Sequence, residues 1–174
     1  LPDDQPITAY GVVRASGTFS GGTFHSAVGA FSRAGEMRKA YAARRQAEPR
    51  PEGGRRSRAV GTRPRRDSRL GFWLLPLPTI DPFVVARSAA AIERYGPDFR
   101  YSHYAGFKSL PYAAGTAAGA GVMVVGAQVP PLRKALMSRV KSGDGPSESR
   151  RGKCWFTVDF VGEGGATKEN VRML

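Results

Sequence analysis

An uncharged run at residues 109–132 restricts the fold more than any other feature, because an apolar helix must be covered by protein or by lipid. Lys108 and Arg133 bracket the run. A proline near each end confines the helix to residues 112–129, which would be roughly 27 Å long at 1.5 Å per residue. That length is marginal for a bilayer span. We therefore expect a helix that packs on protein or lies on a membrane surface without crossing it.

The small residues of this helix favour close packing. Gly115 and Gly119 form a GxxxG pattern, by which membrane helices approach one another. In a buried helix the same glycines would let another element of the protein approach, and a run rich in alanine and glycine is only weakly apolar. Two alternatives therefore stay open, a buried helix and a helix on a membrane surface.

Apolar periodicity elsewhere predicts one α+β domain over residues 1–174. Alternating apolar residues indicate strands at residues 7–15, 99–105 and 154–160, the last closed by glycines at 162–165. Helical spacing predicts one long helix that ends near residue 46.

A second helix is expected to start at Asp81, as a capping acid followed by proline, and to stop at Gly96. A short basic helix follows at residues 132–141. The predicted order is strand, long helix, loop, helix, strand, two helices, strand.

Residues 50–69 are rich in arginine, glycine, serine and proline. Like charges repel and the segment has little apolar surface to bury, so it is predicted to be a mobile loop. The whole chain has a formal net charge of +13. This charge indicates either an anionic partner or only the arginine-rich composition that a GC-rich coding sequence tends to give. We expect no nucleic-acid partner, because no aromatic residues interleave the basic tract and no nucleic-acid motif is present.

The sequence carries few residues typical of a complete catalytic site. A single cysteine and two distant histidines, His25 and His103, provide no cluster with zinc-ligand spacing, so no metal site is expected. Gly119 and Gly121 lack the third glycine of a dinucleotide fingerprint, so we expect this chain alone to bind no nicotinamide cofactor. Both histidines are interpreted as packed or surface residues, and no catalytic residue is assigned.

The glycine-rich segment before the long helix is the candidate binding site. Exposed backbone N–H groups at a helix start, together with the helix dipole, favour an anionic or carbonyl oxygen. The candidate substrate-binding residues are Gly21, Gly22, Thr23 and Ser26. The alternative is an ordinary capped turn, with Ser20 or Thr23 as the cap.

Several segments resemble one known family in their order and spacing. They are Gly21-Gly22-Thr23-Phe24-His25-Ser26-Ala27, Pro82-Phe83-Val84-Val85-Ala86-Arg87-Ser88, Phe99-Arg100-Tyr101, Gly143-Asp144-Gly145-Pro146-Ser147 and Phe156-Thr157-Val158-Asp159-Phe160-Val161-Gly162-Glu163-Gly164. Together with the small-residue helix, they are similar to the saccharopine-dehydrogenase-like oxidoreductases, including the bacterial trans-acting enoyl reductases of glycolipid synthesis. Residues 50–69 resemble the family least, so the resemblance implies no role for them.

The resemblance implies an open mixed β-sheet with helices packed on it, the substrate-side domain of a Rossmann-containing enzyme. It implies that a Rossmann half precedes these residues, that the family continues past residue 174, and that this chain is inactive alone. The full-length protein would use NADP or NAD to reduce an enoyl or keto group of a lipid-like or small carbonyl substrate. It would be cytoplasmic, with residues 109–132 touching a membrane or lipid droplet, and a homodimer stays open. The alternative function is a non-catalytic membrane-surface or lipid-associated module; a nucleic-acid binder would rest on charge alone.

Overall fold

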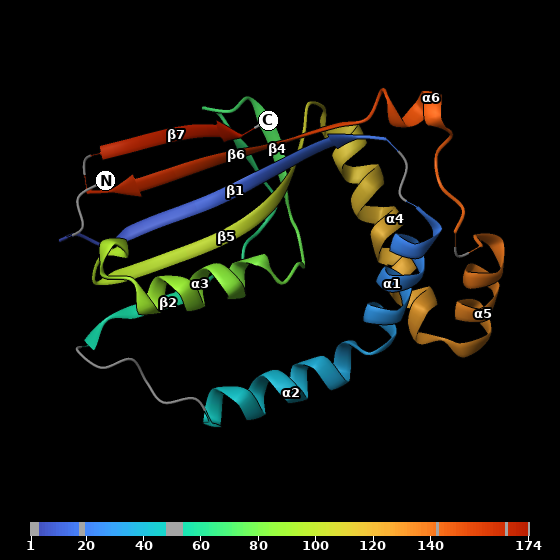
Figure 1. Ribbon diagram of the computed structural model, residues 1–174, viewed down its shortest axis with the longest axis horizontal. Helices are drawn as coiled ribbons and strands as arrows, with labels where there is room; N and C mark the ends of the chain where they lie inside the picture. Colours follow the sequence, from blue (N-terminus) through green and yellow to red (C-terminus); the bar gives the residue numbers. More distant parts are fainter. Residues whose placement is uncertain (1–3, 18–19, 48–53, 142, 166, 174) are drawn as a thin grey trace. The chain divides into compact units, whose positions relative to one another are not determined.

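The computed structural model describes residues 4–17, 20–47, 54–141, 143–165 and 167–173 (Figure 1). The sequence predicts one domain, whereas the chain forms two compact units. Unit 1 comprises residues 1–15, 50–113 and 156–174, and unit 2 comprises residues 16–49 and 114–155.

Unit 1 is built on an open mixed sheet, so the expected α+β class with such a sheet is confirmed. Its strands are β1 (Ile7–Ser16), β2 (Arg56–Ala59), β3 (Arg65–Asp67), β4 (Phe72–Pro76), β5 (Asp98–Phe107), β6 (Trp155–Gly164) and β7 (Thr167–Met173). The order is β3-β4-β5-β1-β6-β7, and β2 pairs with β5 outside this path. Strands β1 and β2 run parallel to β5, whereas β4 runs antiparallel to it.

Alternation along the strands creates two apolar clusters. Ile7 of β1 packs with Phe99 and Tyr101 of β5 and with Ala89 of α3 (Asp81–Ala91). Residues at the alternate positions of β1 and β5 belong to a second cluster, which comprises Tyr10, Val12, Phe72, Leu74, Tyr104 and Val161. Helix α3 lies against β2 and β5 (Figure 1). Each fully buried aliphatic side chain in such a cluster contributes about 1.5–3 kcal/mol.

The start of α3 differs from the expected cap. The helix begins at Asp81 itself, Ile80 occupies the N-cap position, and no side chain caps the helix. Asp81 therefore acts as an acidic residue of the first turn, where the helix dipole favours it. A short 3₁₀ turn, η2 (Glu93–Tyr95), then ends at Gly96, whose φ of 73° suits glycine and matches the expected stop.

Residues 50–69 are predicted to be a mobile loop, but the structure places the strands β2 and β3 within this segment; residues 50–53 lie outside the described residues. Strand β2 pairs in parallel with Asp98–Tyr101 of β5, and β3 pairs with β4. The like charges do not prevent this pairing, and the guanidinium groups of Arg65 and Arg66 lie over aromatic rings. The guanidinium of Arg65 lies 4.7 Å from the centre of the Tyr10 ring, a cation–π arrangement.

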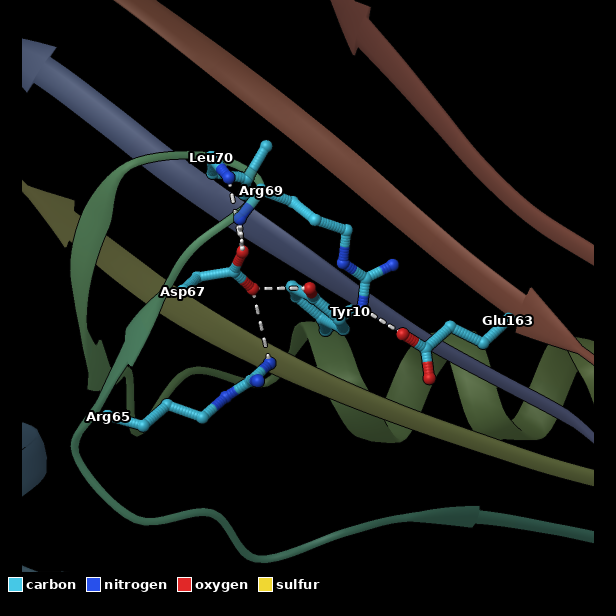
Figure 2. Close-up of polar contacts among 6 residues, drawn as sticks. All are labelled: Tyr10, Arg65, Asp67, Arg69, Leu70 and Glu163. Atoms are coloured by element: carbon cyan, nitrogen blue, oxygen red, sulfur yellow. Dashed lines mark hydrogen bonds and ion pairs between the residues drawn. The ribbon is translucent and has the colours of Figure 1, made fainter.

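A buried carboxylate fixes the turn between β3 and β4. Asp67 is only 3% exposed. Its Oδ2 accepts a 2.5 Å hydrogen bond from the Tyr10 hydroxyl and lies 3.6 Å from the Arg65 guanidinium (Figure 2). Its Oδ1 accepts the backbone N–H groups of Arg69 and Leu70 at 3.0 and 3.1 Å. Arg69 in turn pairs with Glu163 of β6 (Figure 2).

The end of the chain also differs from the expectation. The glycines at 162–165 do not close the last strand; β6 continues to Gly164 and pairs antiparallel with β7. Gly165, with a φ of 54°, lies in the turn between them. Strand β7 has a polar sequence without clear alternation, which is why its residues gave no strand signal.

Unit 2 is helical in the part that the structure describes. Its helices are α1 (Gly21–Ser32), α2 (Ala34–Ala47), most of α4 (Leu110–Gln128), α5 (Pro130–Arg139) and α6 (Glu148–Arg151). The single long helix predicted up to residue 46 is broken at Arg33, which caps α1. The helix predicted at residues 112–129 is observed as α4, and the short basic helix as α5.

Helix α4 is long and apolar enough to cross a membrane by length and composition, and most of it is exposed. Val122 and Val125 are 73% and 63% exposed. Close packing occurs at Gly126, where a Cβ would lie 2.9 Å from Leu136 of α5. Within the described part of the chain, no atom beyond the neighbouring residues and the helix's own backbone lies within 4 Å of the Cβ positions of Gly115 or Gly119, so the buried-helix alternative does not account for their GxxxG pattern.

Candidate functional site

The first turn of α1 is capped by Ser20. The Ser20 side chain accepts the N–H of Thr23 at 3.3 Å and lies 3.0 Å from the Thr23 hydroxyl. The Ser20 carbonyl accepts the N–H of Phe24 at 3.0 Å. Because the Thr23 hydroxyl is within hydrogen-bond distance of Ser20, part of its hydrogen-bonding capacity is used before any ligand binds.

Gly21 has a packing role. Its N–H donates to the carbonyl of Asp144 at 2.6 Å. A Cβ at this position would lie 2.0 Å from the carbonyl oxygen of Lys141. Only glycine therefore lets the turn at residues 141–144 approach the helix so closely.

The same turn is held by further contacts within unit 2. Asp144 accepts the N–H of Lys141 at 3.0 Å through its side chain. His25 Nε2 lies 2.5 Å from the carbonyl oxygen of Val140. His25 is thus a packed residue, as the sequence interpretation holds, and it ties α1 to the end of α5.

Gly22 is the accessible glycine of the pair. Among the residues that the structure describes, nothing accepts its N–H, and a Cβ added there would meet only the Ser20 hydroxyl, at 3.9 Å. The side chains of Thr23 and Ser26 are exposed. Three of the four sequence candidates therefore face outward from the start of α1.

A shallow cleft adjoins this helix start. Its volume is about 410 Å³, and it is lined by Gly21, Val140, Asp144, Gly145, Pro146, Ser147 and Arg150. The Arg150 guanidinium and the positive end of the α1 dipole favour a carboxylate or a polarised carbonyl oxygen here. Gly22, Thr23 and Ser26 are not part of the lining, so the structure brings only Gly21 of the four candidates to the cleft wall.

Sequence reasoning missed a second cleft, which lies in unit 1 around His103. The ring of His103 is only 11% exposed. A signal was available, because His103 continues the buried alternation of Phe99 and Tyr101 along β5. A titratable residue at a buried strand position is an unusual choice for packing alone.

The described residues contain no group of three or more His, Cys, Asp or Glu side chains that could hold a metal ion. Comparisons with protein-family models, with curated proteins and with solved structures found no match to this chain.

Proposed function

We propose that this chain is the substrate-binding part of an NAD(P)-dependent oxidoreductase of the saccharopine-dehydrogenase-like kind. The reaction would be reduction of an enoyl or keto group on a lipid-like or small carbonyl substrate. NADP or NAD would be held by a nucleotide-binding half outside residues 1–174, and this chain alone would bind neither. The enzyme would be cytoplasmic, with peripheral contact to a membrane, and a homodimer stays open.

The observation that supports this proposal best is the N–H of Gly22, which has no acceptor among the residues that the structure describes. Hydride transfer to an enoyl or keto group builds negative charge on the carbonyl oxygen, and a preorganised N–H donor stabilises that charge. Ser20 and Asp144 occupy the neighbouring N–H groups of Thr23 and Gly21, and among the described residues the donor of Gly22 stays available. The dipole of α1 adds to the attraction.

Neighbouring groups would define the rest of the substrate site. The exposed hydroxyl of Ser26 lies one turn further along α1. Arg150 on the adjoining cleft would attract a carboxylate or phosphate group at another position of the substrate. Catalytic residues that move a proton are not assigned.

The test is Gly22→Val in the protein that contains both halves. A valine fits the open space at Gly22 but keeps a substrate oxygen away from the N–H. Turnover of an enoyl or keto lipid should fall on the order of 100-fold, while NADPH affinity and melting temperature stay unchanged. The matched control is Gly29→Val, on the same helix two turns later, where the nearest atom to a Cβ is 3.8 Å away. The proposal fails if both variants have the same rate, or if the loss at Gly22 follows a loss of thermal stability.

A second candidate function, a non-catalytic membrane-surface module, is favoured by α4. Its valines at 122 and 125 are exposed. No acidic residue occurs between Lys108 and Lys141, whereas basic residues lie at both ends of this stretch. An exposed apolar helix with basic flanks is attracted to anionic bilayers.

Vesicle sedimentation separates this candidate from the first. If it holds, the chain should sediment with vesicles containing phosphatidylserine, and Val122→Asp with Val125→Asp should abolish this. Equal sedimentation of the double variant would exclude α4 as the membrane contact. Retention in membranes after a carbonate wash would indicate a spanning helix.

A further inference from the structure

The cleft around His103 arises from a break in strand pairing. Strand β2 reaches β5 from one end and pairs with it up to Tyr101, while β4 comes from the other end and pairs with Tyr104–Phe107. The last contacts are the N–H of Val60 on the Tyr101 carbonyl, at 2.9 Å, and the N–H of Leu77 on the His103 carbonyl, at 3.0 Å. Both segments then leave β5, and the space between them is a cleft of about 410 Å³.

The walls of this cleft are mostly apolar. They include Val60, Pro76, Leu77, Pro82 and Phe83. All of them belong to unit 1. A concave apolar surface of this size is typical of sites that take a small apolar molecule.

Two buried polar side chains in the cleft have no hydrogen-bond partner among the described residues. They are the ring of His103, at both nitrogens, and the hydroxyl of Thr79. The Oδ2 of Asp81 lies 3.6 Å from His103 Nδ1, too far for a hydrogen bond. Buried polar groups in native proteins are almost always paired, so two orphans in one cleft point to a missing partner.

The chemistry of these groups specifies the partner. Burial lowers the pKa of His103 by more than the Asp81 carboxylate raises it, which favours the neutral ring with one donor and one acceptor. A threonine hydroxyl also both donates and accepts. The nearby Asp81 carboxylate would repel an anionic ligand. A ligand hydroxyl group, in contrast, can form hydrogen bonds with both His103 and Thr79.

We propose that the break between β2 and β4 on β5 is a binding site for an uncharged apolar alcohol or carbonyl compound. His103 and Thr79 hydrogen-bond its oxygen, and the walls around Val60, Leu77 and Phe83 bury its apolar part. The site lies in unit 1 and is independent of the substrate site proposed at α1 in unit 2.

Titration of the 174-residue chain with 1-octanol, followed by amide NMR, tests this site. The alcohol should cause saturable shifts at residues 59–62 and 77–79. Octanoate, with the same chain and a negative head, should bind at least roughly tenfold more weakly. Thr79→Val should weaken 1-octanol binding by roughly tenfold, the usual effect of losing one hydrogen bond.

The matched control is Thr62→Val, at the other threonine of the cleft lining, and it should retain the affinity for 1-octanol. His103→Phe removes the other hydrogen-bonding group and should likewise weaken 1-octanol binding by roughly tenfold. The proposal is overturned if octanoate binds as well as 1-octanol, if the two threonine variants behave alike, or if the shifts map to α4.

Discussion

Two buried polar sites in unit 1 differ in how their hydrogen bonds are satisfied. At the turn between β3 and β4, Asp67 accepts one hydroxyl and two backbone N–H groups. In the cleft on the other part of the sheet, His103 and Thr79 have no hydrogen-bond partner among the described residues. A satisfied network stabilises the fold, whereas unsatisfied groups cost stability until a ligand supplies the bonds. The difference therefore separates a structural site from a binding site.

The pKa values reflect the same difference. Burial, together with the hydrogen bond to Asp67, raises the pKa of Tyr10 to about 12. Burial acts to raise the pKa of Asp67, but the bonds from Tyr10, Leu70 and Arg69 and the charge of Arg65 lower it overall. For His103, burial prevails and lowers the pKa. The protein thus stabilises the charge of Asp67 and disfavours a charge on His103.

The largest expected effect is that of removing Asp67. Asp67→Ala should lower the free energy of unfolding of unit 1 by about 3 kcal/mol, because it leaves the Tyr10 hydroxyl and two N–H groups without an acceptor. Urea unfolding is best followed in a Trp155→Phe background, where Trp73 of β4 is the remaining tryptophan. Tyr10→Phe should cost less, about 1 kcal/mol. A cost below that of Tyr10→Phe would show that the network does not hold the turn.

A smaller loss is expected at Gly11 of β1, which pairs with His103 of β5. A Cβ at Gly11 would lie 2.5 Å from the Tyr101 hydroxyl and 3.5 Å from His103 Cδ2. Gly11→Ala should therefore destabilise unit 1 by about 2 kcal/mol by overpacking. The control is Gly61→Ala in the same unit, where no described atom is within 4 Å, and it should change stability by less than about 0.5 kcal/mol. Equal effects of the two substitutions would contradict the tight packing around Gly11.

Replacing His103 itself should have little effect at pH 7 in the ligand-free chain. His103→Phe removes polar atoms that have no partner among the described residues and keeps an aromatic ring, so the free energy of unfolding should change by less than about 1 kcal/mol. A loss comparable to that of Asp67→Ala would mean that His103 is a structural residue.

The pH dependence of stability distinguishes the two sites further. A histidine with a lowered folded-state pKa binds fewer protons when folded, so stability falls as pH drops below its unfolded value of about 6.5. His103→Phe should flatten the stability profile in that range. Asp67, with a lowered pKa, contributes stability above its unfolded pKa of about 3.9 and loses it as pH falls further. Asp67→Asn should therefore flatten the profile only at the acid end.

The smallest effect is expected at Glu163, at the edge of the Asp67 network. Its pair with Arg69 is partly exposed, with side chains 34% and 39% accessible. Glu163→Gln should cost less than about 0.5 kcal/mol, and the difference should vanish in high salt. A larger, salt-independent loss would place Glu163 inside the structural network.

Local sequence patterns predicted the regular elements but not the long-range pairing. Strands β1 and β5 alternate apolar residues, and α4 is an uncharged run, so each was visible from neighbouring residues. Strand β2 was missed because it pairs with β5, and β3 was missed because Tyr10 of β1 holds its Asp67; both partners are distant in sequence. The sequence shows that the start of α1 is glycine-rich. Only the close approach of the Lys141 carbonyl explains why residue 21 has to be a glycine.

Local sequence patterns did not predict either of the two clefts. The His103 cleft depends on β2 and β4 ending opposite each other on β5, and periodicity within one strand does not carry this information. The cleft beside α1 combines Gly21 with Ser147 and Arg150, more than a hundred positions later in the chain. The sequence interpretation of His103 as a packed or surface residue did not show that its ring nitrogens lack a hydrogen-bond partner among the described residues.

The ¹⁵N NMR spectrum of the imidazole rings, with and without 1-octanol, tests most directly that the His103 cleft is a binding site and not a structural site. The chain has two histidines, so each ring can be assigned. At saturation the His103 nitrogens should shift as a new hydrogen bond forms. Those of His25, whose Nε2 already lies 2.5 Å from the Val140 carbonyl oxygen, should stay unchanged. Unchanged His103 nitrogens at saturation, or equal shifts of both rings, would contradict the account.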